Sequence, residues 1–254
     1  MTTLVLTTDP ANGYVRLTIT PTENVTRVTR TDVNGTADVR TMTGQLPHTD
    51  ASVLTLDDYE ASHGTARYAV TTTAGTVRGT IVLALSAPWL GTPENPQYST
   101  AVPSVLDYSA SGETRSIVHE PEYGLGDPIV IVRGSTPRRG SLRVGARDYA
   151  EALKVFRIFQ RGQTMLLRQP GQHAGMDMYF IATSYEIVTA AAWAEHSVFD
   201  VTCTYLEVGR PAGALSGALG WTWAALEAAY PTWADVEAAY ATWGDVRTDR
   251  RTNP

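Results

Sequence analysis

One helix is clearly marked in a sequence whose other ordered runs look like strands. It is predicted at 148–161, where Asp148 can cap the first turn and Glu151 can reach back to it. Gly162 follows and can close the helix in the left-handed conformation. The apolar face is expected to comprise Tyr149, Ala152, Leu153, Phe156 and Phe159. Because the flanking runs are strand-like, a lone helix here must lay this face on a sheet.

Five basic residues in and near this region are candidates for contact with another subunit. Lys154, Arg157 and Arg161 belong to the predicted helix, and the last two also sit where the helix dipole favours cations. Arg138 and Arg139 are expected at the tip of a hairpin between 129–133 and 141–144. They are either solvated there or meet an acidic patch on a partner.

Composition limits the classes of protein to consider. A chain of 254 residues has room for one large or two modest domains, and its 43% hydrophobic and 18% charged residues suit globular folding. The net charge of −6 disfavours a dedicated nucleic-acid binder and docking on anionic membranes. The sole cysteine, Cys203, excludes an intrachain disulfide and is expected to be buried.

No targeting or membrane segment is evident. The first residues lack the basic start and long apolar run of a signal peptide, and no apolar run reaches the length of a membrane span. We therefore expect a protein that is made in the cytoplasm, stays soluble and does not insert into membranes.

The first 86 residues alternate apolar and polar side chains, as half-buried strands do. Val15, Leu17 and Ile19, for example, alternate with polar neighbours. Turn signals such as Asn34-Gly35 separate about seven short runs, a spacing typical of an antiparallel sandwich. The predicted strands are 4–7, 14–20, 25–31, 38–42, 53–56, 65–73 and 77–85. A β-sandwich domain is thus predicted at 1–86.

A short motif in this domain carries a family resemblance. The run Asp58-Tyr59-Glu60-Ala61 is followed by a Gly-bearing turn and a strand centred on Tyr68. This pattern resembles the fibronectin-type-III-like domains of minor tail proteins in actinobacterial siphophages. Packing of the sandwich by Tyr59 and Tyr68 is the simpler explanation of the two tyrosines, and it is compatible with the resemblance.

A second domain is predicted at 104–211, after a Pro-rich linker at 87–103. Trp89 in the linker either fills the seam between domains or stacks on a ligand. The order of strands, hairpin, helix and strands is typical of an α+β or small-barrel fold. It also resembles minor tail proteins from 57 to 211, and the helix-flanked barrel is similar to tail-tube and distal tail proteins. The resemblance rests on Pro88-Trp89-Leu90, the apolar strand 129–133, the helix running into Met165-Leu166-Leu167-Arg168, and 199–211.

A ten-residue repeat marks the C-terminal segment 212–254, after a Gly/Ala-rich hinge. Each copy holds a Thr that can cap a short helix, and a Trp follows it. Helices this short are marginal in water, so the repeat needs a surface to pack on. That surface is its own domain or a neighbouring subunit, unless the Trp series stacks on sugars. The candidate interface residues are Trp223, Tyr230, Trp233, Tyr240 and Trp243.

No catalytic or cofactor-binding pattern stands out. The histidines are scattered, and the chain has neither a phosphate-binding Gly-rich loop nor a nucleophile elbow. Neighbouring acids such as Asp57 and Asp58 are conceivable glycosidase carboxylates, but every soluble protein offers such pairs. We therefore predict no catalytic residue, no metal, no cofactor and no enzymatic activity.

The predicted fold class is mainly β, with an N-terminal sandwich, a barrel with one flanking helix, and a short helical repeat. The resemblance implies a structural protein of the phage virion, at the distal tail or baseplate of the tail tip. It implies a homo-oligomeric ring, hexameric in proteins of this kind, between the tail tube protein and the tail hub or other minor tail proteins. The tape measure protein is a further expected neighbour, and phage DNA would pass through the channel without specific binding.

Two rival functions remain open from the sequence. One is a host-binding adhesin of the tail tip, whose sandwich or Trp repeat engages cell-wall glycan. The other is a tail enzyme that cleaves glycan or peptidoglycan, for which the sequence supplies no convincing residues.

Overall fold

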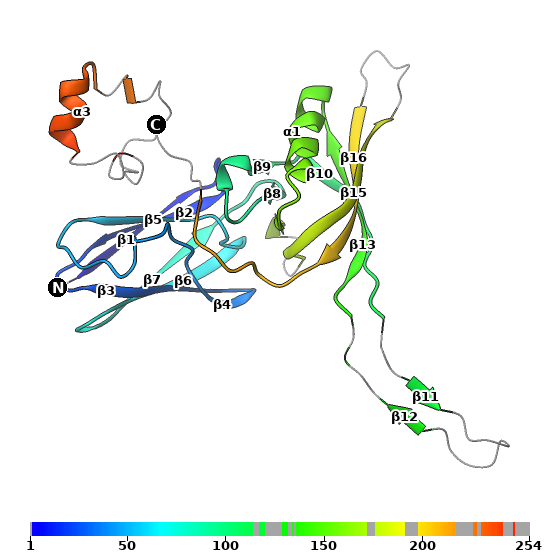
Figure 1. The fold of residues 1–254 in the computed structure, drawn as a ribbon, viewed down its shortest axis with the longest axis horizontal. Coiled ribbons are helices and arrows are strands. Elements are labelled where there is room, and N and C mark those ends of the chain that lie inside the picture. The colour runs from blue at the N-terminus through cyan, green and yellow to red at the C-terminus, as the bar shows by residue number, and fades with distance from the viewer. Residues whose placement is uncertain are drawn as a thin grey trace. The chain divides into compact units, whose positions relative to one another are not determined.

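The computed structural model shows a mainly β protein of the α+β type (Figure 1). The chain divides into two compact units. Unit 1 comprises Met1–Ala84, Pro93–Tyr98 and Gly213–Pro254, and unit 2 comprises Leu85–Thr92 and Ser99–Ala212. The residues described by the structure are 2–113, 117–119, 129–131, 134, 136–171, 176–190, 198–216, 226–227, 230–240 and 246.

Unit 1 contains two antiparallel sheets, which form two layers (Figure 1). The three-stranded sheet has the order β1-β2-β5, with strands at Thr3–Asp9, Tyr14–Thr20 and Leu54–Asp58. The four-stranded sheet has the order β4-β3-β6-β7, with strands at Gly35–Asp38, Val25–Asp32, Gly64–Thr72 and Gly75–Leu83. The alternation predicted in β2 is confirmed, because Val15, Leu17 and Ile19 are all fully buried.

The strand predicted at 38–42 lies earlier in the chain. Gly35 has φ of 99°, a conformation that suits glycine, and β4 therefore starts directly after the turn and pairs Gly35 with Asp32. The sheet pairing ends at Asp38. Beyond it, Arg40 and Met42 leave the sheet, and both contact a later segment of the chain instead.

Unit 2 is built on one antiparallel sheet of seven strands, in the order β10-β13-β16-β15-β14-β8-β9. The strands lie at Ser104–Tyr108, Arg139–Ala146, Val198–Glu207, Met178–Ala190, Met165–Arg168, Trp89–Gly91 and Thr100–Ala101. A separate pair, β11 at Ile117–His119 and β12 at Ile129–Ile131, belongs to the hairpin that joins β10 to β13. A 3-10 turn lies at Pro96–Tyr98 in unit 1.

The predicted barrel does not close in the part of the chain that the structure describes. The sheet is open, and its two edges are β10 and β9, which follow each other in sequence. Within one chain the two edge strands do not pair with each other. The register of β10 shifts between Val105 and Asp107, β9 has only two residues, and Pro103 between them has no amide hydrogen to donate. The domain is therefore an open curved sheet with one helix.

The Pro-rich stretch predicted to be a linker supplies two of these strands. Trp89 starts β8, pairs in register with Arg168 of β14, and is 6% exposed. The Arg168 guanidinium lies 5.8 Å from the centre of the Trp89 ring, a cation–π contact inside unit 2. Prolines flank the strand without interrupting its pairing, which explains why the composition suggested a linker.

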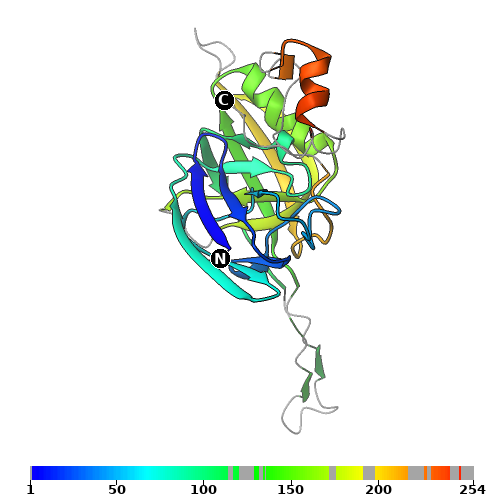
Figure 2. The ribbon, with the colours of Figure 1, turned by 90° about the vertical axis from the view of Figure 1, so that its left-hand side faces the viewer.

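Helix α1, at Tyr149–Gln160, covers one face of the sheet, as Figures 1 and 2 show from two directions. Asp148 caps it by accepting a hydrogen bond from the Glu151 amide at 2.7 Å, as predicted. The Glu151 carboxylate accepts from the Arg147 amide, at 2.7 Å, one residue before the predicted position. Gly162 adopts φ of 63° after the helix, as its sequence predicts.

The buried face of α1 is rotated from the predicted one. Its buried residues are Ala152, Val155, Ile158 and Phe159. Tyr149 is instead 55% exposed and touches Phe199 edge-on. Phe159 stacks on Tyr185 of β15, and Phe156 meets the same ring edge-on. These aromatic contacts fix the helix on strands β15 and β16.

No helix among the described residues is long and apolar enough to cross a membrane.

The close approach of β10 and β13 makes Gly140 a sensitive position. A Cβ atom added there would lie 1.9 Å from the Ser109 carbonyl oxygen, and backbone cannot rotate away as a side chain can. We predict that Gly140→Ala lowers the free energy of unfolding by about 1–3 kcal/mol. The matched control is Gly209→Ala, which meets no atom within 4 Å. Equal denaturation midpoints for the two variants would contradict this packing.

Candidate interaction surfaces

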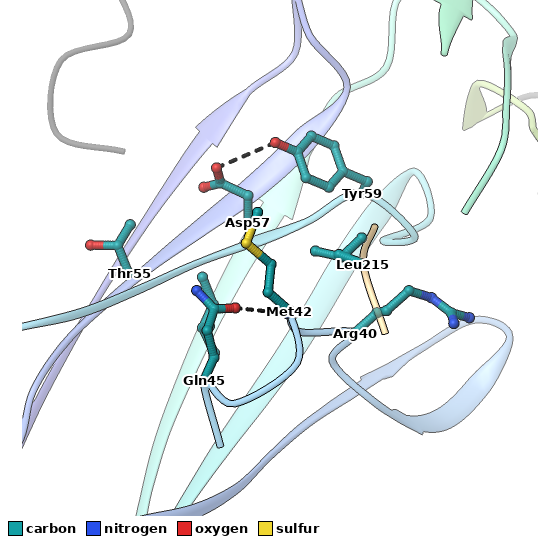
Figure 3. A pocket seen from close by; sticks show the side chains of 8 residues that line it. Arg40, Met42, Gln45, Thr55, Asp57, Tyr59 and Leu215 are labelled. Carbon is teal, nitrogen blue, oxygen red and sulfur yellow. Dashed lines mark hydrogen bonds between the residues drawn. The ribbon is translucent and has the colours of Figure 1, made fainter. Parts of the chain in front are cut away.

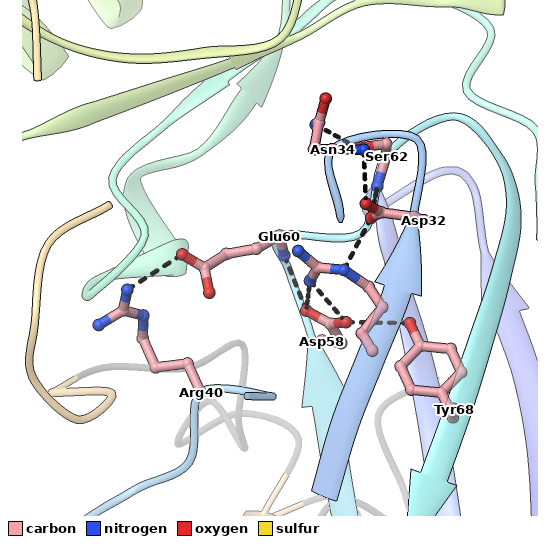
Figure 4. A network of polar contacts seen from close by, with 8 residues as sticks. Asp32, Asn34, Arg40, Asp58, Glu60, Ser62 and Tyr68 are labelled. Atoms are coloured by element: carbon pink, nitrogen blue, oxygen red, sulfur yellow. Dashed lines mark hydrogen bonds and ion pairs between the residues drawn. The ribbon is translucent and has the colours of Figure 1, made fainter. Parts of the chain in front are cut away.

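Buried charges occupy the region of unit 1 where β5 turns into β6 (Figure 4). Arg30 on β3 donates from Nη1 to both oxygens of Asp58 at 2.8 Å, and its Nε lies 2.7 Å from Asp32 Oδ2. The Tyr68 hydroxyl on β6 donates to Asp58 Oδ2 at 2.9 Å. Because Asp58 belongs to one sheet and its partners belong to the other, the network ties the two sheets together.

Charge outweighs burial in this network. Burial alone would raise the pKa of Asp58, but the charge and hydrogen bonds of Arg30, with those from the Glu60 amide and Tyr68, hold that pKa below its ordinary value. Burial and the Asp58 charge raise the pKa of Tyr68. The site is therefore an ionised Arg–Asp pair with a neutral tyrosine. No group in it is poised to exchange a proton near pH 7, so its role is structural. We call the Arg30–Asp58 pair, which joins the two sheets, the ion-pair staple.

The same turn carries a second buried ion pair. Arg40 Nη2 donates to Glu60 Oε1 at 3.0 Å, and the two side chains are 4% and 1% exposed. The other end of the guanidinium reaches a distant part of the chain, because Arg40 Nη1 donates to the Gly213 carbonyl at 2.6 Å. The Leu215 amide donates to the Thr41 carbonyl at 2.9 Å beside it.

The neighbouring acids Asp57 and Asp58 serve different arginines. Arg16 donates to Asp57 from Nε and Nη2, at 2.8 and 3.2 Å, and the Tyr59 hydroxyl donates to Asp57 at 3.3 Å. Asp58 pairs instead with Arg30. The two carboxylates thus do not form the facing pair that glycoside hydrolysis requires. A small pocket beside Asp57 is lined by Met42, Gln45, Thr55, Leu56, Tyr59 and Leu215, among others (Figure 3).

Arg138 and Arg139 lie at the base of the β10–β13 hairpin, and their predicted place at its tip is wrong. Arg138 donates from Nε and Nη2 to Glu207 on β16, at 2.8 and 2.6 Å, and this bonding lowers the pKa of Glu207. Arg139 donates to Glu113 Oε2 at 2.8 Å. Both cations therefore fasten strands within the chain. The residues between β11 and β12 lie outside the described residues.

Past these arginines lie the described parts of the hairpin that we call the arm, namely 111–113, 117–119, 129–131 and 136–138. Ser111 and Arg139 exchange backbone hydrogen bonds at 2.7 and 2.9 Å, and the Thr136 amide donates to the Glu113 carbonyl at 2.8 Å. Beyond them β11 and β12 pair only with each other among the described strands. Ile117 and Ile131 on this ladder are 38% and 43% exposed. An isolated two-stranded ladder is marginal in water, so this one gains from a partner surface.

The face of the large sheet opposite α1 mixes polar groups with exposed apolar side chains, among them Ile181 and Leu206, which pair across β15 and β16. Thr183, Ser184 and Thr204 form a hydroxyl cluster there, with two oxygen–oxygen distances of 2.7 Å. Arg143 pairs with Asp200 across β13 and β16. On α1 itself, the predicted contact residues Lys154, Arg157 and Arg161 are all exposed.

The C-terminal repeat forms a small core of its own. Residues at one repeat position, Leu226, Val236 and Val246, are buried together. Tyr230 and Tyr240, at another position, meet edge-on with ring centres 5.7 Å apart and hydroxyls 3.2 Å apart. Thr232 and Asp235 form the predicted type of capping box at the start of α3, Trp233–Ala239. The structure thus brings the two tyrosines together.

The tryptophans of the repeat do not take part in this small core where they are described. Trp233 begins α3 and is 59% exposed, the largest exposure of any described tryptophan. Trp223 and Trp243 lie outside the described residues.

The ion-pair staple was missed by sequence reasoning. Its members Arg30 and Asp58 are 28 residues apart and lie on different sheets, so no local pattern links them. The one available signal was the acidic run Asp57-Asp58 at the end of a strand that is otherwise apolar at alternate positions.

The described residues contain no group of three or more His, Cys, Asp or Glu side chains placed to hold a metal ion. Comparison with known proteins finds no matching family model and no matching curated protein.

The two arginines of β3 allow a matched test of the staple. We predict that Asp58→Asn lowers the free energy of unfolding by about 3 kcal/mol, because it removes one of the two buried carboxylates that compensate the Arg30 charge. The control is Arg27, which lies on β3 like Arg30 but pairs with Asp38 at an exposed site. Asp38→Asn removes that partner and should change the free energy of unfolding little. Urea denaturation at pH 7 measures both. Equal losses in the two variants would show that Asp58 is not part of a buried staple.

The stability difference between wild type and Asp58→Asn should also depend on pH. The folded pKa of Asp58 is below its unfolded value of about 4, so its stabilisation is present above that pH and is lost as pH falls through the folded pKa. The difference should therefore shrink on acidification from about pH 6 to pH 2. A difference that stays constant over this range would contradict the assignment.

Proposed function

We propose that this chain is a structural protein of a phage tail tip, which assembles into a homo-oligomeric ring through unit 2. The sequence resemblance to minor tail and distal tail proteins supplies the biological setting. The observation that carries the proposal is the form of unit 2, an open sheet with one covered face, two unpaired edges and a projecting two-stranded ladder.

The two faces of the sheet suit the wall of a ring. Helix α1 covers one face with Ala152, Val155 and Phe159 and would lie on the outside. The opposite face carries hydroxyls and the Arg143–Asp200 pair, and would line the channel. Among the described residues, this face combines hydroxyls and an Arg–Asp pair with exposed apolar side chains such as Ile181 and Leu206, so a passing DNA would meet no strong phosphate-binding cluster.

The edges of the sheet offer a way to join copies. Edge strands have unpaired backbone groups, which natural proteins cover, shorten or pair. In a closed ring, edge strand β10 of one copy would lie beside edge strand β9 of the next copy. The expected number of six subunits comes from the family resemblance. The arm would then lie on the neighbouring copy and bury Ile117 and Ile131.

The remaining parts of the chain would connect the ring to other tail proteins. The unit 1 sandwich would project as an adaptor module, and the C-terminal repeat would clasp an adjacent protein through Trp233. The proposed neighbours are the tail tube protein and the tail hub or other minor tail proteins, with the tape measure protein in the channel. The proposed location is the virion.

The arm provides the test of assembly. We predict that the double variant Ile117→Glu with Ile131→Glu folds normally but loses most of its oligomer, since charges would enter the contact with the next copy. The control is Val53→Glu with Val82→Glu, which places the same charges on exposed sites of unit 1, 51% and 59% exposed. Light scattering of the purified proteins gives their masses. A wild-type protein that stays monomeric, even with its tail neighbours present, would refute the ring.

A second candidate function, a cell-wall adhesin, is favoured by one observation, the exposure of Trp233. An exposed tryptophan presents a large apolar ring that can pack on a sugar or on a protein surface. Binding of the purified protein to host cell walls that is lost in Trp233→Ala would support the adhesin. Loss of incorporation into tails, with cell-wall binding absent from the wild type, would support the clasp.

A further inference from the structure

The polypeptide returns to unit 1 after unit 2 and is bound there as an extended peptide. This strap, residues 213–216, lies against a seat formed around Arg40, Thr41 and Met42. Leu215 and Met42 form a parallel β-bridge, with the Leu215 amide donating to the Thr41 carbonyl at 2.9 Å. The half-buried Leu215 side chain also lines the pocket in Figure 3. Main-chain bonds combined with one side-chain pocket are a common means by which a domain recognises an extended peptide.

Polar contacts fix both ends of the strap. At its start, Arg40 Nη1 donates to the Gly213 carbonyl at 2.6 Å, and Gly213 has φ of 134°, which side-chain-bearing residues rarely adopt. At its end, the Ser216 amide donates to the Glu94 carbonyl at 2.8 Å, and its hydroxyl donates to Asn95 Oδ1 at 2.7 Å. The seat is therefore a specific site for this short sequence.

Nothing in these contacts requires the strap and the seat to belong to the same copy. The same atoms would meet if a neighbouring copy supplied the strap, and such exchange between identical chains is a low-cost route to assembly. The chain just before the strap can act as a hinge, since Gly209 and Ala212 are exposed and Pro211 lies between them. The chain after the strap leads to the C-terminal repeat, whose described buried residues form a separate cluster.

We propose that the seat is an exchange site, which in the assembled ring binds the strap of the neighbouring copy, so that the partner's Leu215 completes the pocket. This inference rests on the proposed ring. Within a ring, the neighbouring strap would be tethered close to the seat, as a chain's own strap is, so exchange could compete with closure within one chain. Two features of the seat would maintain its selectivity, namely the buried Arg40–Glu60 pair and the need for glycine at position 213.

Disulfide trapping distinguishes exchange from closure within one chain. One preparation carries Met42→Cys and another carries Leu215→Cys, and the two are mixed, assembled and mildly oxidised. Bridge partners of this kind are close enough for a disulfide. The native thiol does not interfere, because Cys203 is 1% exposed and burial raises its pKa to about 12.

The expected result is a disulfide-linked dimer in the mixed ring. A chain that carries both cysteines serves as the positive control for geometry, and a mixture of Met42→Cys with Val53→Cys controls for random oxidation. Rings of normal mass in which only the double-cysteine chain is oxidised, and only within itself, would overturn the exchange while leaving the ring intact. Absence of rings by light scattering would instead refute the proposed function on which the exchange depends.

A variant of the strap adds a second test that leaves the seat unchanged. Gly213→Ala should lower the yield of linked dimer by about fivefold or more, because alanine resists the positive φ. Its added Cβ would also approach Glu94 Oε1 to 3.2 Å. An unchanged yield in this variant would show that linkage does not depend on the seated strap and would count against the exchange.

Discussion

The architecture of unit 2 depends on one packing arrangement, a twelve-residue helix laid on a seven-stranded sheet. The aromatic contacts of Phe156 and Phe159 with Tyr185 hold the helix on the central strands. A single helix covers only one face, so the opposite face must be polar or must meet another molecule. The hydroxyl cluster of Thr183, Ser184 and Thr204 meets the first condition only in part, because exposed apolar side chains such as Ile181 and Leu206 share this face. The edge strands and the arm are the places where contact with another molecule is expected.

Unit 1 is stabilised in a different way. Its two sheets share an apolar core, and a buried ion pair between Arg30 and Asp58 joins them at one end. Such pairs add less stability than an apolar contact of the same size, but breaking one is costly, and they can fix a unique arrangement. Here the pair holds the turn that also positions Glu60. Through Glu60 and Arg40, the same turn holds the returning strap.

Local signals predicted the elements well and their assembly less well. The Asp148 cap and the alternation of Val15, Leu17 and Ile19 were readable, because each depends on residues close in sequence. The rotation of α1 toward Val155 was not, since it is set by the sheet beneath it. The ion pairs join residues that are far apart in the sequence and meet only in the folded chain. The open sheet edges likewise depend on which strands pair in the fold. The same limit applies to Arg138, whose partner Glu207 lies on another strand.

We propose that copies of unit 2 close into a ring, with the sheet face opposite α1 toward the channel. Electron microscopy of the purified protein, with particles averaged in end-on views, can test this. Closed rings of uniform subunit number around a central channel are the expected result. Single particles of monomer size, or open chains of variable length, would contradict it.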